Sequence, residues 1–355
     1  MIKMNLQQNL KDGLAGVMRV RDEERLLESC IDSCINALDE LIVVYHDCTD
    51  STPEILERKQ KEDPDKLKVY NYKHKVLSYN LTEEEFEEVL NLPDDSEKLL
   101  ANVCNYGFSK SHYKFATKID TDQIYFEDEL KKWRDVCAKE TNTTWGFYCI
   151  VGWLFMMYFT LYRRLSFKLG NPCLWMLPDW LVVNLFPYYR RYAERKMLQG
   201  KASIALSGIN LFKDGKWYIP FDKYNNHHPY NGLGDTVIFK LSEDTYFLRN
   251  INEKARSATD GFTNPFKMMF AGPMWFHQHA NRYQCFDKIK QVKDSYPDLF
   301  IPIDDFLKMS YKEVHAKMDE KAHSLYQRIF FALVHKVGIK TVSNHMDVIE
   351  KYGIK

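Results

Sequence analysis

The sequence predicts an α/β fold in which a mainly parallel, Rossmann-like sheet is flanked by helices. Short apolar runs alternate with helix patterns over the first 125 residues, which is typical of parallel strands joined by crossover helices. Aromatic and apolar side chains concentrate in residues 146–200 and predict a helical insertion. Helical spacing of apolar residues recurs after Ile301 and predicts a helical C-terminal region.

The elements of the first third follow in order from their residue patterns. Each strand is a short apolar run, and each helix has apolar residues on one face. A buried parallel strand is the expected structure of the near-continuous apolar run 41–45. Thr52 is expected as the N-cap of a helix that has Pro53 at its first position. We expect strands at 14–20, 41–45, 67–72 and 114–119, helices at 22–37, from Thr52 onward and at 99–109, and a solvated acidic helix face at 82–88.

The fourth predicted strand ends in two aspartates, Asp120 and Asp122. In an extended backbone this spacing places both carboxylates on one side, where their oxygens suit Mg²⁺ or Mn²⁺. Such an ion could hold a diphosphate. The alternative is a solvated turn, because Asp tolerates turn geometry. Ligands of parallel α/β sheets bind beyond the carboxyl ends of the strands, which favours the metal site.

Bulk properties exclude several classes of protein. The 355 residues carry a formal net charge of zero, which argues against a nucleic-acid binder that relies on a positive field. The eight cysteines include no Cys-x-x-Cys pair, so free thiols in a reducing compartment are expected. Residues 1–12 are polar and lack an apolar signal core. We therefore expect a cytoplasmic protein.

The segment 146–200 has two interpretations. Apolar runs, each too short to span a bilayer, precede the pairs Arg163-Arg164 and Arg190-Arg191. This combination suits a helix that lies on anionic lipid, which would make the protein peripheral on the inner face of the cell membrane. The same composition also suits a helical subdomain packed over the sheet or an interface between proteins.

The remaining sequence divides into two further parts. Asp214-Gly215 between apolar runs predicts a hairpin within 205–220, and a loop rich in Asn, His and Gly follows at 225–235. One helical stripe is expected from Val314 to Leu333. We expect a nucleotide-sugar-binding half at 1–145, the insertion at 146–200, an acceptor-binding half at 201–285 and the helical region at 286–355.

Three segments resemble the family-2-like, inverting GT-A glycosyltransferases. Residues 17–24 are similar to that family's first strand and turn, 42–52 to its second strand and loop, and 105–122 to its helix, strand and Asp-x-Asp motif. The resemblance covers about residues 14–125. One departure is that Tyr45-His46 precedes Asp47, where the family has an acid directly after the strand.

The resemblance implies roles for individual residues. Arg19, Glu23, Asp47, Asp50 and Asp120 would contact the nucleotide-sugar. Asp120 and Asp122, together with His277 and His279, would hold Mn²⁺ or Mg²⁺. The family's general base, which takes the acceptor's proton, would be Asp235 or Asp244. Trp217 and Trp275 could stack on the apolar face of a sugar, although burial is the commoner role of tryptophan.

Together these features predict a metal-dependent inverting hexosyltransferase. The resemblance implies a UDP-linked nucleotide-sugar as the donor, and a glycan or lipid-linked glycan in lipopolysaccharide or capsule assembly as the acceptor. One alternative is a GT-A-fold protein that binds carbohydrate without turnover. Another is a sugar-nucleotide pyrophosphorylase, which should have a glycine-rich loop after the first strand. No glycine follows Val20 there, so this alternative is the weaker.

Overall fold

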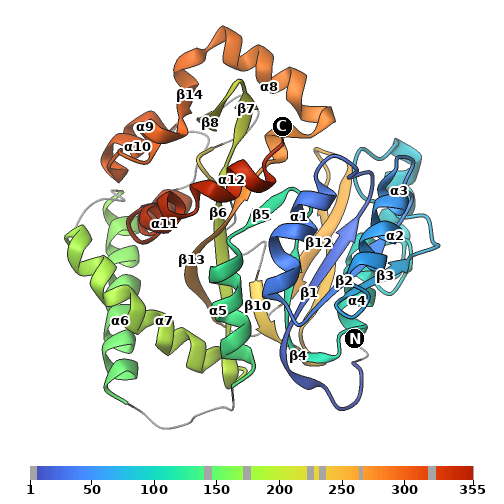
Figure 1. Cartoon of the computed structure of the whole chain (residues 1–355), viewed down its shortest axis with the longest axis horizontal. Helices are drawn as coiled ribbons and strands as arrows, with labels where there is room; N and C mark the ends of the chain where they lie inside the picture. Colours follow the sequence, from blue (N-terminus) through green and yellow to red (C-terminus); the bar gives the residue numbers. More distant parts are fainter. Residues whose placement is uncertain are drawn as a thin grey trace.

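The computed structural model describes residues 6–139, 146–170, 177–221, 228–231, 237–263, 267–318 and 325–354. A mixed sheet runs through the centre of the molecule (Figure 1). In spatial order it contains β3 (Leu67–Asn71), β2 (Glu40–Tyr45), β1 (Lys11–Val20), β4 (Tyr113–Ile119), β10 (Val237–Lys240), β6 (Ala202–Asn210), β13 (Lys267–His277) and β5 (Gln123–Tyr125), with β9 (Tyr230–Asn231) beside β6.

The strands β3, β2, β1 and β4 are all parallel to one another. Their alternating side chains enter two separate cores: Met18 and Val43 pack in one, whereas Val17 and Ile42 pack in the other. Burying one such side chain contributes about 1.5–3 kcal/mol. The flanking helices are α1 (Leu27–Cys34), which continues as a 3-10 turn (Ile35–Ala37), α2 (Thr52–Glu62), α3 (Glu83–Asn91), α4 (Leu100–Ser109) and α5 (Glu127–Cys137).

The predicted elements of this half are confirmed, with small shifts at their ends. The helix after β1 begins at Leu27 rather than at Asp22. Ser51, not Thr52, is the N-cap of α2, because the helix already begins at Thr52. The Thr52 hydroxyl accepts a hydrogen bond from the Glu23 backbone N–H at 2.9 Å. That bond ties the loop after β1 to the start of α2.

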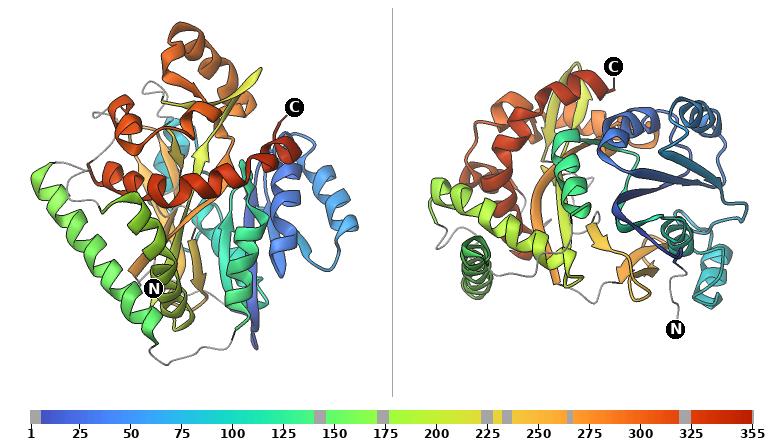
Figure 2. Two further views of the ribbon diagram at one scale, coloured as in Figure 1. Left: turned by 60° about the vertical axis from the view of Figure 1, so that its left-hand side comes forward. Right: turned by 60° about the horizontal axis from the view of Figure 1, so that its bottom comes forward.

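The second half of the sheet is covered by helices of the insertion and of the C-terminal region. α7 (Asp179–Leu198) packs on β6 and β13, and α6 (Phe147–Leu169) packs on α7. Figure 2 shows α6 at the outer edge of the molecule. The helices after the sheet are α8 (Tyr283–Ser295), α9 (Ile303–Phe306), α10 (Tyr311–Lys317), α11 (Leu325–Asn344) and α12 (Met346–Tyr352), with 3-10 turns at His279–Asn281 and Pro297–Leu299.

Two small sheets complete the described structure. β11 (Tyr246–Asn252) and β12 (Ser257–Thr263) form a hairpin that contacts α4. β7 (Phe212–Asp214), β8 (Lys216–Pro220) and β14 (Phe300–Pro302) form the other. The predicted hairpin turn at Asp214-Gly215 is therefore confirmed, although the preceding run belongs to β6 of the main sheet. The stripe predicted from Val314 to Leu333 draws on both α10 and α11, and its members Val314, Met318, Ile329 and Leu333 are buried.

The fold class predicted from the sequence is confirmed: a sheet with a parallel first half, flanked by helices and followed by a helical C-terminal region. Within the described part of the chain, no helix is long and apolar enough to cross a membrane.

Candidate functional site

A polar pocket of about 910 Å³ lies where β1 and β4 end. Its walls come from both halves of the chain: the turns after β1 and β4 on one side, and β12, the end of β13 and the start of α8 on the other. The carboxyl ends of parallel strands are the usual position for ligands in such sheets. The pocket is therefore the candidate functional site.

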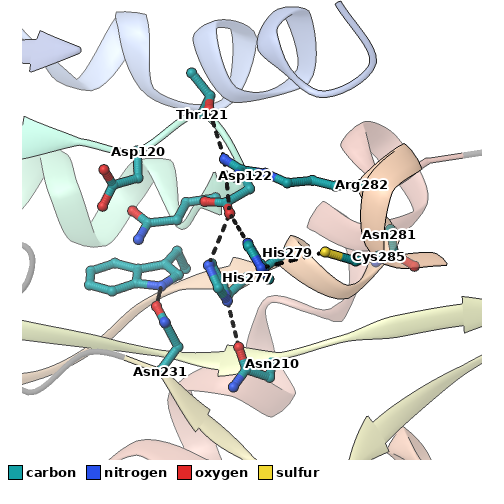
Figure 3. A network of polar contacts seen from close by, with 12 residues as sticks. Asp120, Thr121, Asp122, Asn210, Asn231, His277, His279, Asn281, Arg282 and Cys285 are labelled. Carbon is teal, nitrogen blue, oxygen red and sulfur yellow. Dashed lines mark hydrogen bonds and ion pairs between the residues drawn. The ribbon is translucent and has the colours of Figure 1, made fainter. Parts of the chain in front are cut away.

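Asp122, His277 and His279 converge in this pocket (Figure 3). The Oδ2 atom of Asp122 lies 3.2 Å from Nε2 of His277 and 3.2 Å from Nδ1 of His279. One ligand atom from each of the three residues lies within 4.8 Å of the others. A carboxylate oxygen and two imidazole nitrogens in this arrangement could hold a divalent cation.

Asn210 fixes the orientation of the His277 ring. The Asn210 amide nitrogen donates to the His228 carbonyl at 2.5 Å, so its carbonyl oxygen faces His277. Nδ1 of His277 can then only donate to that oxygen, at 2.5 Å, which leaves Nε2 as the nitrogen turned toward Asp122. Partners of this kind commonly orient metal-binding histidines.

Charges around Asp122 keep it ionised. Burial alone would raise the pKa of Asp122, but His277, Arg282 and His279 outweigh burial and hold the pKa well below its usual range. The hydrogen bonds that His279 makes to the Asp122 carboxylate, which accepts, and to the Cys285 sulfur raise the pKa of His279 to about 9. In turn, His279 lowers the pKa of the Cys285 thiol, whose sulfur lies 3.7 Å from Nε2 of His279.

Asp120 lines the same pocket but stands outside the cluster of three. Its backbone carbonyl accepts the N–H of Gln123, so the chain turns between the two aspartates instead of remaining extended. Figure 3 shows the two carboxylates apart from each other. Asp120 pairs with Lys118 at 3.4 Å. The expectation that both aspartates face one ion from one extended strand was therefore wrong in its geometry.

Arg282 connects the cluster to the loop after β1. Its Nη2 lies 2.6 Å from Oε1 of Glu23 and 3.2 Å from Oδ2 of Asp122. Burial and the nearby charge of Asp122 raise the pKa of Glu23 to about 7, although Arg282 acts in the opposite direction. Both side chains line the pocket. Arg282 was missed because its position three residues after His279 carries no recognisable pattern.

Arg19 also lines the pocket and is held there by Asp260 of β12. Nη2 of Arg19 lies 2.9 Å from one Asp260 oxygen, and Nζ of Lys118 lies 3.5 Å from the other. Burial would raise the pKa of Asp260, but Arg19 and Lys118 lower it to about 2. Lys118 could have been found from its spacing, since it lies two residues before Asp120. Nothing around Asp260 in the sequence distinguishes it from a loop residue.

Asp47 and Asp50 stabilise the loop after β2. One oxygen of Asp47 accepts the N–H of Val76 at 2.8 Å. Asp50 accepts the N–H groups of Glu24 and Thr52, each at 3.0 Å. Among the described residues the pocket lining includes neighbouring His46 but neither of these two aspartates. The structure thus gives both a role in shaping the loop.

Other predicted site residues lie elsewhere. Trp275 is fully buried, and its indole N–H donates to Asn231 at 2.8 Å, so it has no free face for a sugar and that expectation was wrong. Trp217 lies in β8 against Lys213, and Asp244 lies in an exposed turn before β11, both outside the described pocket lining. Asp235 lies outside the described residues.

No protein-family model and no curated protein matches the chain. Among solved structures, it is similar to glucosyl-3-phosphoglycerate synthase from Mycobacterium tuberculosis in complex with Mn²⁺, UDP-glucose and phosphoglyceric acid. That match has 20% identity over 32% of this chain and 34% of the other, with a TM-score of 0.22.

Two further matches are of similar extent. The mannosyltransferase PcManGT from Pyrobaculum calidifontis, in complex with GDP-Man and Mn²⁺, has 16% identity over 40% of this chain and 36% of the other, with a TM-score of 0.23. TarS (1–349) from S. aureus, in complex with UDP, has 16% identity over 35% of this chain and 31% of the other, with a TM-score of 0.24. The chain thus matches about a third of the length of each of these structures.

Proposed function

We propose that the chain is a metal-dependent inverting glycosyltransferase that moves a sugar from a nucleotide-sugar to a hydroxyl of a glycan acceptor. The observation that carries this proposal is the convergence of Asp122, His277 and His279 in a polar pocket at the carboxyl ends of β1 and β4. The resemblance of residues 14–125 to family-2-like GT-A enzymes points to a UDP-linked hexose as the donor.

The donor atoms in the cluster fit Mn²⁺ or Mg²⁺. Mg²⁺ prefers an all-oxygen shell, whereas imidazole also suits other first-row metals, so the two histidines favour Mn²⁺. Three protein ligands leave coordination positions for diphosphate oxygens. When bound, the cation would neutralise charge that develops on the leaving diphosphate.

The chain's own cations would orient the donor. Arg19, Lys118 and Arg282 all line the pocket, and each is held by a carboxylate. A donor phosphate could take up hydrogen bonds from their N–H groups while the carboxylates keep the cations in position. Asp120, in the same pocket, would meet the ribose or the diphosphate.

A carboxylate is needed to take the proton from the attacking hydroxyl. Asp235 remains the favoured base, since it follows Asn231, a pocket residue, by four positions. Asp244 is less favoured because of its exposed turn. The acceptor would be a glycan or lipid-linked glycan in lipopolysaccharide or capsule assembly.

Donor hydrolysis tests this function. The protein is incubated with a panel of UDP- and GDP-linked sugars, with and without Mn²⁺, and release of the nucleoside diphosphate is measured. We expect Mn²⁺-dependent release from one donor, with a loss of about 100-fold or more in Asp122→Asn, because charge stabilisation is a major part of such catalysis. Asp298→Asn, an exposed carboxylate of the same type, should leave release unchanged.

Two results would contradict the proposal. Full activity of Asp122→Asn would remove the metal role of the cluster. If the unmodified protein consumes no donor, the proposal that it is an enzyme is wrong. Mn²⁺-dependent binding of UDP, measured by calorimetry, would then support the alternative of a non-catalytic binding protein.

A further inference from the structure

α6 exposes a continuous stripe of large apolar side chains on its outer side. Phe147, Leu154 and Leu161 are 69%, 54% and 57% exposed. Ile150 and Met157 lie between them and are also exposed. These five residues recur every three or four positions, which places them on one face of the helix. A solvated helix normally presents polar residues on such a face.

The opposite face of α6 is well packed, so the exposed stripe does not result from a loose helix. Phe155 and Tyr162 are buried, and α6 packs on α7 and α11. At Gly152, α6 and α7 approach so closely that an added Cβ would collide with the Tyr188 backbone carbonyl of α7. α6 is therefore fixed to the body of the protein while its apolar stripe is exposed, and Figure 2 shows the helix at the outer edge of the molecule.

The charges along the stripe are all positive. The 23 residues of α6 include no Asp or Glu. Arg164 and Lys168 continue the stripe over the last turns of the helix, and both are exposed. We call the five apolar residues together with Arg164 and Lys168 the α6 outer face.

The second pair of arginines expected to face lipid is directed elsewhere. Arg190 lies 2.9 Å from Glu129 and stacks over Trp133, while Arg191 stacks over Tyr148. Arg190 thus joins α7 to α5 within the fold. The basic charge available beside the apolar stripe comes from the end of α6.

We propose that the α6 outer face docks on the surface of an anionic lipid bilayer. Apolar and aromatic side chains would enter the boundary between headgroups and acyl chains, and the basic residues would pair with lipid phosphates. An apolar protein partner would desolvate Arg164 and Lys168 without neutralising them. A second copy of the chain would contribute no acidic residue from its own α6. This proposal concerns location and does not depend on glycosyl transfer.

Vesicle flotation of the full chain tests the proposal. We expect binding to phosphatidylcholine vesicles that contain about 30% phosphatidylglycerol and much weaker binding to phosphatidylcholine alone. Replacing both Arg164 and Lys168 by Glu should weaken the binding about tenfold or more, since each basic residue near the surface contributes about 1 kcal/mol. Lys216→Glu with Lys288→Glu makes the same charge change at two exposed lysines of the β8 and α8 region and should leave binding unchanged.

A second pair of substitutions, a test and its control, addresses the apolar part of the α6 outer face. Leu154→Glu should lower flotation on anionic vesicles about tenfold, because it would place a charge in the headgroup boundary. Leu90→Glu, at a leucine of α3 that is 43% exposed, should have no effect. Circular dichroism would check that every variant is folded.

Three results would overturn the proposal. These are absence of binding to either vesicle type, binding that Leu154→Glu leaves unchanged, and a concentration-dependent dimer in light scattering that Leu154→Glu dissociates. The last result would identify the α6 outer face as an interface between copies of the chain.

Discussion

Asp260 joins two cations that enter the pocket from different strands. Its side chain is 5% exposed and contacts Arg19 of β1 and Lys118 of β4. Replacing Asp260 by Asn would leave two buried cations without their counter-charge. An uncompensated buried charge strongly destabilises the folded state. We expect Asp260→Asn to lower the free energy of unfolding in urea at pH 7 by about 3 kcal/mol. Asp298→Asn, at an exposed site, serves as the control.

The same residue predicts a dependence on pH. The pKa of Asp260 is lowered to about 2 from an ordinary value of 3.8, so the folded protein binds this proton more weakly than the unfolded chain. Its stabilising contribution, about 2 kcal/mol, is present above about pH 4 and is lost as the pH falls toward 2. The difference in unfolding free energy between the original protein and Asp260→Asn should therefore shrink over this range in urea titrations. A difference that stays constant from pH 7 to pH 2.5 would contradict the role of Asp260.

At the scale of elements, the contact between α6 and α7 depends on one glycine. An alanine at Gly152 would push its Cβ into the Tyr188 carbonyl and the Tyr192 side chain. A backbone carbonyl cannot move aside as the end of a flexible side chain can, so α6 and α7 would have to separate. We expect Gly152→Ala to destabilise the protein by about 1–3 kcal/mol in thermal or urea unfolding. Met157→Ala, at an exposed position of the same helix, should change stability by less than about 0.5 kcal/mol; equal effects of the two would refute the close contact.

The elements that could be predicted are those whose signal is local. The apolar run of β2 and the apolar face of α1 each predict their element from a few neighbouring residues. The structure contains both elements. The pairings of β6 with β10 and β13 join residues far apart in the chain, and no local pattern encodes them. β12 carries Asp260 in a segment rich in small and polar residues, so neither the strand nor its role could be predicted.

The same distinction applies to the candidate site. His277 and His279 were predicted to share a side, and both reach Asp122. A tight turn separates the carboxylates of Asp120 and Asp122. The prediction assumed an extended backbone through both residues and therefore could not include this turn. Trp275 was assigned to a sugar because aromatic residues suit that role, but its place in a central strand buries it. Burial of this kind is decided by the whole fold.

On the scale of the whole molecule, the cluster lies at a seam where β5, from the first half of the chain, pairs with β13, from the second half. Asp122 immediately precedes β5, which pairs with the end of β13, where His277 lies. The backbone N–H of Gln278 donates to the Asp122 carbonyl at 2.6 Å. The relative position of the three ligand side chains is thus fixed by pairing between a strand of the first half and a strand of the second.

The C-terminal helix braces this seam. α12 contacts α1 and β5, and its Ile349 is 3% exposed. Just before α12, His345 stacks on Phe126 at the end of β5. Through these contacts the last element of the described chain holds the strand that follows Asp122.

We therefore expect Ile349→Ala to loosen the seam. Truncating a buried isoleucine costs about 2–5 kcal/mol, and the loss should appear first where α12 rests. Hydrogen exchange measured by mass spectrometry should speed up in peptides that cover β5. The increase should be smaller in peptides that cover β3, at the opposite edge of the sheet. Glu350→Ala changes an exposed neighbour and should leave both unchanged. If Ile349→Ala accelerates exchange equally in β5 and β3, α12 stabilises the protein as a whole and does not brace the seam.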